Sequence, residues 1–264
     1  MLKKIGFSLL MAFARPAAVT ATKINTAPLA PQKNTRDQPT LLVVNNPAAT
    51  LTRPAWPNGS SLLPTDVEFP LLDVDFCGEV MPFEQADVVS RWKHVFTLFR
   101  PQSPKIDALQ KRADSFFPMV DSTLAAYDIP ADFKYIPLAE SGLKPRAVSP
   151  KGAGGYWQLM PATARELGLK VGGKNDERFN AQKATVAACK YLRKLYAQFG
   201  SWSLVAAAYN VGPGYMKAQL KKQADCSYYQ MKLPRETRYY LFRVLLYKEI
   251  LSRPTDYTAY LTGV

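Results

Sequence analysis

The sequence has few of the side chains from which most metal sites and activated nucleophiles are built. Histidine occurs once, as His94, and the three cysteines, Cys77, Cys189 and Cys226, form no C-x-x-C pair. Zinc sites need several histidine or cysteine ligands, and serine or cysteine nucleophiles usually need a neighbouring base. We therefore expect no metal and no cofactor, so that any chemistry must come from carboxylates and neutral polar groups. Cys189 lies in an alanine-rich helical pattern and is expected in the core.

Long hydrophobic runs are also missing. The apolar stretch 5–14 follows two lysines, but its ten residues are too few to span about 30 Å of hydrocarbon. This pattern, followed by the small residues Val19 and Ala21, is typical of a signal peptide over residues 1–21. We expect an exported protein with no integral membrane segment after signal removal. A lipid anchor is not expected either, because the first cysteine is Cys77.

Negative charge is scarce relative to positive charge. The chain has 34 lysines and arginines against 21 aspartates and glutamates, which gives a net charge of +13. This excess favours a polyanionic partner, and nucleic acid, an anionic membrane and an anionic cell-wall polymer all qualify. The basic residues are scattered, with no basic helix and no aromatic-basic repeat, and the export signal also argues against nucleic acid.

The composition changes along the chain. Residues 22–65 are rich in proline, threonine, asparagine and alanine, which predicts a disordered or polyproline-like linker. Residues 66–83 are an irregular apolar stretch, which we interpret as one extended piece. From residue 87 onward, apolar residues recur at helical spacing between glycine and proline turns. No alternation supports a large sheet, so a mainly α domain is predicted.

Local signals place several helix ends. Pro130 and Asp132 open a short helix that carries Glu140, and Pro137 inside it predicts a kink. Gly200 ends one helix and Ser201 caps the next. The other expected ends are Pro161 at the start and Gly168 at the end of one helix, and 236–251 as the bounds of the last helix.

Glu140 stands in an unusual setting, in the sequence YIPLAESGLK. It follows five uncharged residues, and Ile136, Leu138 and Leu143 beside it are apolar. A glutamate near a helix end is usually solvated. A partly dry carboxyl has a raised pKa, however, and can donate a proton near neutral pH to a glycosidic oxygen.

Two further motifs fit a sugar-binding site when they are taken together. The stretch SPKGAGGYWQLMPATA contains three glycines and sets Tyr156 and Trp157 beside Gln158. The stretch AAAYNVGPG places Tyr209 and Asn210 just before a turn. Aromatic rings beside amides are typical of sugar subsites. Taken alone, the first motif would be a glycine turn with a core tryptophan, and the second a helix C-terminus.

In this order, the two motifs, the preceding ESGLKPRAV and the later LPRETRYYLF resemble a known family. The chain is similar, over about residues 87–251, to the catalytic domain of lytic transglycosylases of the soluble-lytic-transglycosylase type. Within them it resembles most the membrane-bound lytic murein transglycosylase D branch. The resemblance implies a lysozyme-like helical fold of the goose and SLT type, with at most a small β element.

The resemblance also implies a reaction. Glu140 would be the single catalytic acid and base, and would protonate the oxygen that links N-acetylmuramic acid to N-acetylglucosamine. As a carboxylate, Glu140 would then take the proton of the muramoyl C6 hydroxyl, which closes a 1,6-anhydro ring. No water enters, so one carboxylate suffices where two-carboxylate hydrolases need two.

Supporting roles follow from the same resemblance. The implied substrate-binding residues are Ser141, Gly155, Tyr156, Gln158, Tyr209, Asn210 and Tyr240. Ser141 would bond to the acid or to the substrate's N-acetyl group, while Gln158 and Asn210 would hold amides and hydroxyls of the sugar. Tyr240 would contact Glu140, with Tyr239 as its rival by one position.

The organisation expected from these observations has four parts. They are a signal peptide (1–21), a proline-rich linker (22–65), an N-terminal extension with helices that pack on the core (66–114) and the catalytic domain (115–264). The expected partner is the glycan strand of peptidoglycan, met in the periplasm or outside the cell, with the protein acting as a monomer.

Two alternatives on the same fold remain open. A lysozyme-like hydrolase would need a second carboxylate facing Glu140, and Glu166, Asp176 and Glu177 stand in charged contexts that indicate solvated faces. A glycan-binding module without catalysis is the other alternative, although retention of the acid together with the polar residues around it argues against it.

Overall fold

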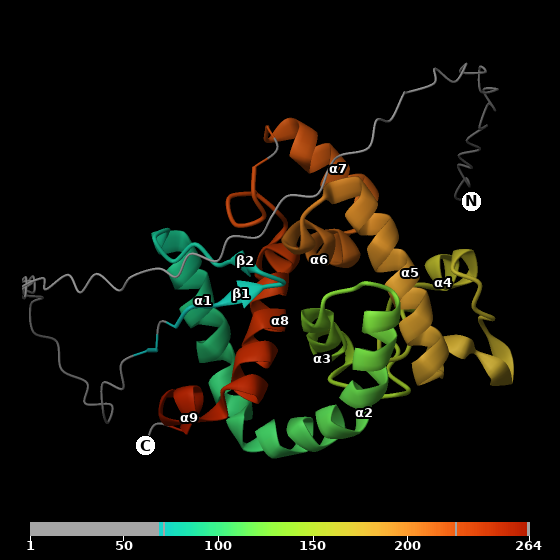
Figure 1. Cartoon of the computed structure of the whole chain (residues 1–264), viewed down its shortest axis with the longest axis horizontal. Coiled ribbons are helices and arrows are strands. Elements are labelled where there is room, and N and C mark those ends of the chain that lie inside the picture. The colour runs from blue at the N-terminus through green and yellow to red at the C-terminus, as the bar shows by residue number, and fades with distance from the viewer. Residues whose placement is uncertain (1–68, 71, 225, 263–264) are drawn as a thin grey trace, which may run out of the picture. The chain divides into compact units, whose positions relative to one another are not determined.

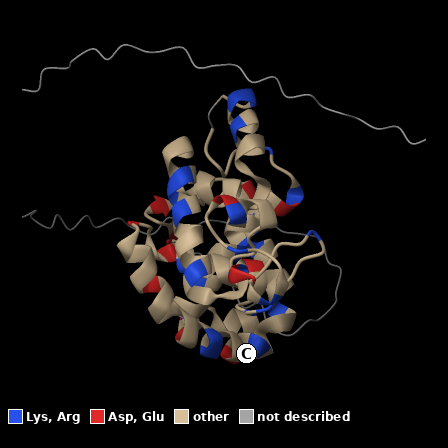
Figure 2. Cartoon of the chain, turned by 90° about the vertical axis from the view of Figure 1, so that its right-hand side faces the viewer, with Lys and Arg blue, Asp and Glu red and all other residues tan. Residues whose placement is uncertain are grey.

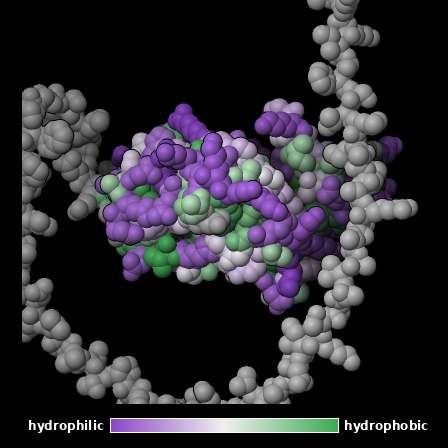
Figure 3. Space-filling model, turned by 90° about the horizontal axis from the view of Figure 1, so that it is seen from above, coloured by the Kyte–Doolittle hydropathy of each residue, from purple (hydrophilic) through white to green (hydrophobic). Residues whose placement is uncertain are grey.

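Helices make up most of the described chain, as the mainly α class predicted. The computed structural model describes residues 69, 70, 72–224 and 226–262, so the predicted signal peptide and linker lie outside the described residues. The described residues belong to one compact unit (Figure 1). None of their helices is long and apolar enough to cross a membrane. Hydrophilic side chains cover much of the face seen in Figure 3.

The elements follow one another in a simple order. The strands are β1 (Asp75–Phe76) and β2 (Glu79–Val80). The α-helices are α1 (Ala86–Phe99), α2 (Ile106–Ala126), α3 (Ile136–Ser141), α4 (Pro161–Glu166), α5 (Ala181–Phe199), α6 (Trp202–Val211), α7 (Pro213–Lys222), α8 (Arg235–Ser252) and α9 (Pro254–Thr262). Short 3-10 helices cover Arg100–Lys105, Ala131–Tyr135, Gly173–Asn175 and Glu177–Phe179.

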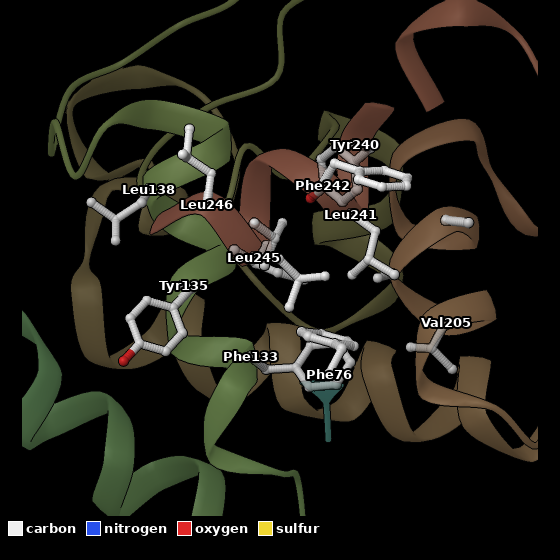
Figure 4. Packing of buried hydrophobic residues seen from close by; sticks show 14 of the residues in the cluster. Phe76, Phe133, Tyr135, Leu138, Val205, Tyr240, Leu241, Phe242, Leu245 and Leu246 are labelled. Carbon is white, nitrogen blue, oxygen red and sulfur yellow. The ribbon is translucent and has the colours of Figure 1, made fainter. Parts of the chain in front are cut away.

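Helix α8 forms the centre of the core. Its side chains from Tyr240 to Leu246 are buried, with the exception of Arg243, and it packs against α1, α3, α6 and α9. Figure 4 shows Leu241 and Leu245 of α8 near Phe133 and Phe76. The central turns of α8 carry apolar side chains in several directions, and each apolar surface gains free energy when neighbouring elements cover it.

The predicted helix ends mostly agree with the structure. The last helix runs one residue further than predicted at each end. Gly200 has a left-handed φ of 66°, and the Ser201 side chain caps α6. Pro161 begins α4, and Gly168 follows its end with φ 88°. Cys189 is fully buried in α5, as expected.

The prediction of one kinked helix around Pro137 was wrong in its detail. The segment divides into the 3-10 helix Ala131–Tyr135 and the α-helix α3. Pro137 lies in the first turn of α3, where a missing N–H leaves no helical hydrogen bond unmade. The proline therefore begins the helix that carries Glu140 and does not bend it.

The interpretation of residues 66–83 as one extended piece was also wrong. Within this stretch β1 and β2 pair as an antiparallel hairpin, with Phe76 opposite Glu79. The turn residues Cys77 and Gly78 have φ values of 56° and 81°. Two successive positive φ angles are the geometry of a tight hairpin turn, for which glycine is favoured. Cys77–Gly78 was therefore the signal for the hairpin.

The hairpin holds the start of α6. The Glu79 carboxylate accepts hydrogen bonds from the Trp202 N–H at 2.5 Å, the Ser203 N–H at 3.1 Å and the Ser201 hydroxyl at 2.9 Å. A carboxylate at a helix N-terminus satisfies unpaired N–H groups and interacts favourably with the helix dipole. A residue some 120 positions earlier in the chain thus caps α6.

We expect Glu79→Gln to lower the free energy of unfolding by about 1–2 kcal/mol, because the charge and one of the two acceptor oxygens are lost. Urea denaturation followed by circular dichroism measures this change. Glu84→Gln is the matched control, because Glu84 is exposed on the same segment. An equal effect of the two substitutions would contradict the capping role.

Candidate active site

Glu140 lies in the last turn of α3. The preceding residues Ile136, Pro137 and Leu138 are buried against the core, whereas Glu140 itself is half-buried. The helix ends at Gly142, which has φ 57° and whose carbonyl accepts a hydrogen bond from the Arg112 guanidinium of α2 at 2.7 Å. Both ends of α3 are therefore fixed, and the carboxyl of Glu140 is held beside α8.

The surroundings of Glu140 bring its pKa close to neutral pH. Burial raises its pKa to about 7, and it is the largest influence. The hydroxyl of Tyr240 and the charge of Arg243 lower this pKa, while the charge of Glu236 raises it. At neutral pH the carboxyl is thus present in both protonation states, which suits a group that donates and accepts a proton in turn.

Tyr240 is the tyrosine that contacts the acid. Its hydroxyl donates to Oε1 of Glu140 at 2.5 Å, and its side chain is almost fully buried. Tyr239 turns away, and its ring lies 5.1 Å from the ring of His94 in α1. Successive residues of a helix point about 100° apart, so only one of the two can face α3.

Tyr209 and Asn210 lie at the end of α6, and Tyr209 is close enough to Glu140 to be affected by its charge. The Tyr209 hydroxyl donates to the Trp157 carbonyl at 2.6 Å. Burial raises the pKa of Tyr209 well above its ordinary value, and the neighbouring charge of Glu140 raises it further. The amide of Asn210 accepts a hydrogen bond from Thr237 at 2.8 Å and donates one to Glu236 at 3.4 Å. Asn210 thereby links α6 to the start of α8.

Ser141 bonds to backbone carbonyls of its own helix and of the glycine-rich loop. Its hydroxyl lies 2.9 Å from the Pro137 carbonyl and 3.0 Å from the Tyr156 carbonyl, to which it donates. It ties α3 to the glycine-rich loop and makes no hydrogen bond to Glu140. The Tyr156 ring stacks on Phe116 of α2, with ring centres 4.5 Å apart.

The glycine-rich loop is shaped by Gln158 and Gly155. Gln158 has a positive φ of 45°, and its amide donates to the carbonyls of Ala147 and Gly155. A side chain on Gly155 would lie 1.9 Å from the carbonyl oxygen of Arg178. Glycine is therefore required by close backbone packing. Trp157 is fully buried. This agrees with the other interpretation of the motif, in which it is a glycine turn followed by a core tryptophan.

The expectation that Asp176 and Glu177 lie on solvated faces was wrong. Asp176 pairs with the buried guanidinium of Arg178 at 2.8 Å, and this contact lowers the pKa of Asp176. Arg178 in turn donates to loop carbonyls, including that of Gly152 at 2.7 Å. Glu177 pairs with Lys183 and accepts the Lys170 N–H. These acids have structural partners, whereas Glu166 is exposed, as expected.

Sequence reasoning missed the two charged residues that flank the acid, Glu236 and Arg243. Arg243 lies one helical turn after Tyr240, with its guanidinium 5.7 Å from the centre of that ring. Glu236 lies one turn before Tyr240. Their helical spacing from Tyr240 was the available signal. Within the described ranges, no cluster of three histidine, cysteine or acidic side chains could hold a metal.

Comparison with known proteins finds a family that covers part of this site, including Glu140. Residues 121–231 match the family described as Transglycosylase SLT domain. The chain is 30% identical over 151 residues to membrane-bound lytic murein transglycosylase D of Escherichia coli strain K12, covering 55% of this chain and 33% of that protein. It is 36% identical over 118 residues to the soluble lytic murein transglycosylase of Salmonella typhimurium, covering 41% of this chain and 18% of that protein.

A complex of the 70-kDa soluble lytic transglycosylase with bulgecin A aligns with a TM-score of 0.48 and 23% identity, covering 68% of this chain and 29% of that one. The chain spans a third or less of the length of these relatives. The hairpin, α1 and α8 lie outside the matched residues 121–231.

The hydrogen bond from Tyr240 can be tested without any substrate. We expect Tyr240→Phe to raise the pKa of Glu140 by about one unit, because the bond stabilises the ionised carboxylate. Carboxyl NMR titration measures the pKa directly. Tyr239→Phe, which removes a neighbouring hydroxyl that faces away, should leave it unchanged, and a similar shift in both variants would contradict the assignment.

The raised pKa of Glu140 also predicts an effect on stability. The pKa of Glu140 is about 7 in the folded state, whereas its ordinary value is 4.5, so the folded protein binds this proton more tightly. The free energy of unfolding therefore falls as the pH rises from about 4.5 to about 7. Glu140→Gln should therefore raise the free energy of unfolding by about 1–3 kcal/mol at pH 8 and by less at pH 5. Urea denaturation at both pH values tests this, and a gain that does not grow with pH would count against it.

Proposed function

Since residues 121–231 match the family described as Transglycosylase SLT domain, we propose that the protein is a peptidoglycan lytic transglycosylase with Glu140 as its single acid and base. Its substrate is the bond between N-acetylmuramic acid and N-acetylglucosamine, and its product ends in 1,6-anhydro-N-acetylmuramic acid. The observation that carries the proposal is the half-buried carboxyl of Glu140, with a pKa of about 7, held by the Tyr240 hydroxyl.

The first step of the proposed reaction needs the protonated form of Glu140. The carboxyl donates its proton to the glycosidic oxygen, the bond from this oxygen to C1 of the muramoyl sugar breaks, and positive charge develops at C1. The N-acetyl group of the same sugar assists from the opposite face. Desolvation of the carboxyl supports this step because it keeps a large share of Glu140 protonated near pH 7.

The second step needs the carboxylate that the first step leaves behind. Glu140 takes the proton from the C6 hydroxyl, O6 forms the bond to C1, and the carboxyl returns to its protonated form. The nucleophile belongs to the sugar itself, so a high effective concentration replaces the activation of water. Tyr240 and Arg243 favour the ionised form of Glu140 and support this step.

Supporting roles in substrate binding extend the proposal to the other site residues. Gln158 uses its amide N–H groups within the loop, and no described group donates to its Oε1, which suits an acceptor for a sugar hydroxyl or acetamido N–H. Tyr209 and Asn210, at the end of α6, are assigned to the binding of the same sugar. Ser141 acts by holding the loop to α3, and Gly155 acts through the close packing of that loop.

A hydrolase on the same fold is the competing function, and one observation favours it. Glu236 is an acid whose charge acts on Glu140, and it is exposed at the start of α8. A hydrolase would use such a second carboxylate to activate water. In this structure Glu236 accepts a hydrogen bond from Asn210, which supports a role in positioning that amide.

The proposed setting is the cell envelope, with peptidoglycan strands as partner. The lysine and arginine positions, blue on the ribbon in Figure 2, are spread over several elements. A scattered distribution suits weak attraction to an anionic wall more than the contiguous basic surface of a nucleic-acid-binding protein. Export to the periplasm or the exterior, by the predicted signal peptide, is part of this proposal.

We expect Glu140→Gln to lower the rate of peptidoglycan cleavage at least about a hundredfold, because the general acid is lost. Mass spectrometry of the digest identifies the ends. Products that end in 1,6-anhydromuramic acid, one water lighter than reducing ends, are expected from the wild type. The exposed Glu166→Gln is the control and should cleave normally.

Reducing ends from the wild type would replace the transglycosylase with the hydrolase. In that case Glu236→Gln should abolish cleavage as fully as Glu140→Gln. Near-normal turnover by Glu140→Gln would overturn the assignment of the acid in either reaction.

A further inference from the structure

Positive charge is unevenly divided between two parts of the described chain. Residues 69–140, which contain the hairpin, α1 and α2, have seven lysines and arginines against eleven aspartates and glutamates. Residues 141–224, which contain α4 to α7, have fourteen against three. The basic positions are spread over several helices, but these helices follow one another in the chain. The fold therefore has a negatively charged part and a strongly positive one.

The imbalance is greatest at α5 and α7. No aspartate or glutamate occurs between Glu177 and Asp225, a stretch with eight lysines and arginines. Three of these, Arg178, Lys183 and Arg193, take part in salt bridges. The other five are exposed and form no salt bridge with a described residue: Lys190, Lys194, Lys217, Lys221 and Lys222. We call these five residues the lysine surface.

The two helices that carry the lysine surface belong to the same part of the domain. Both α5 and α7 pack against α6, and in Figure 1 both lie away from α9. Tyr191, next to Lys190 in the chain, has its ring 5.6 Å from that of Tyr209, near the end of α6. Because α7 begins two residues after α6 ends, the start of α7 lies near the middle of α5. On each helix, two of the lysines are one turn apart.

Exposed aromatic rings accompany these lysines on both helices. Tyr196 of α5 is 39% exposed and Tyr215 of α7 is 41% exposed. Tyrosine is enriched where a protein meets lipid headgroups, because its ring is apolar and its hydroxyl is polar. Lysine suits the same place, since its apolar stem lies along the surface while the ammonium group reaches a phosphate. This combination fits a layer of anionic headgroups.

We propose that the lysine surface docks the domain on a bilayer that contains anionic phospholipids. Each lysine close to such a bilayer contributes about 1 kcal/mol of attraction, so the five give at most about 5 kcal/mol. The contact is therefore reversible. It goes beyond the proposed function, because none of the five lysines belongs to the residues assigned to catalysis or sugar binding.

The separation of charge also sets the orientation of the docked domain. An anionic bilayer attracts α5 and α7 and repels the negatively charged part that contains α1 and α2. Neutral sugars offer the lysines no charge, whereas a plane of headgroups can meet the lysines of both helices at once. The domain thus lies with α5 and α7 towards the lipid and with α1 and α2 away from it.

Sedimentation with lipid vesicles tests this contact in the mature protein, without the predicted signal peptide. The vesicles contain phosphatidylcholine alone or phosphatidylcholine mixed with phosphatidylglycerol. We expect binding to the mixed vesicles only, and its loss at high salt, because salt screens exposed charges. Combining Lys217→Gln, Lys221→Gln and Lys222→Gln should weaken this binding at least about tenfold.

A second triple variant controls for net charge. Lys93→Gln, Lys105→Gln and Lys111→Gln remove the same charge from exposed positions of residues 69–140. This control should bind the mixed vesicles within about twofold of the wild type, because these lysines face away from the lipid in the docked domain. Equal losses in the two triple variants would overturn the lysine surface, as would equal binding of the wild type to both kinds of vesicle.

Purified cell-wall sacculi distinguish a lipid surface from the wall. If the α7 triple variant loses affinity for sacculi but keeps its affinity for the mixed vesicles, the lysines serve the wall and the proposal fails. The Glu140→Gln protein should bind the mixed vesicles as the wild type does, since the lysine surface is intact. Vesicle binding therefore stands or falls independently of the proposed reaction.

Discussion

The packing of α3 against α8 sets the environment of one carboxyl, and the chemistry of the site depends on it. Glu140 is half-buried beside α8, and burial is the largest influence on its pKa. This burial depends on the position of α8, which packs against α1, α6 and α9 as well as α3. The core therefore does more than stabilise the fold, because it keeps water away from one acid.

Charged side chains hold the other parts of the site in place by binding to backbone groups. Glu79 accepts hydrogen bonds at the start of α6, Arg112 donates to the end of α3, and Arg178 donates to the glycine-rich loop. Each satisfies backbone groups that would otherwise lack partners where regular structure ends. The elements around Glu140 are short, and short elements have few contacts of their own, so these ionic supports replace what length would provide.

The sequence predicted the features that depend on neighbouring residues. Helical spacing and turn residues predicted the mainly α class and the last helix, and the setting of Glu140 predicted its desolvation. Contacts between residues distant in the sequence could not be predicted from it. No local pattern indicates that Glu79 binds the N–H of Trp202. No local pattern indicates that Gly155 packs on Arg178, the partner of Asp176. The positions of Glu236 and Arg243 relative to Glu140 depend likewise on how α8 crosses α3, which periodicity does not determine.

The opposing influences on Glu140 fit a single group that must both give and take a proton. Burial alone would hold the carboxyl protonated, and it could then act as an acid but not as the base of the second step. The Tyr240 hydroxyl and the charge of Arg243 limit this shift and bring the pKa to about 7. A carboxyl without burial would be ionised at neutral pH and could only act as a base. In the proposed reaction, the partial compensation of desolvation by two groups on α8 is what lets one carboxyl serve both steps.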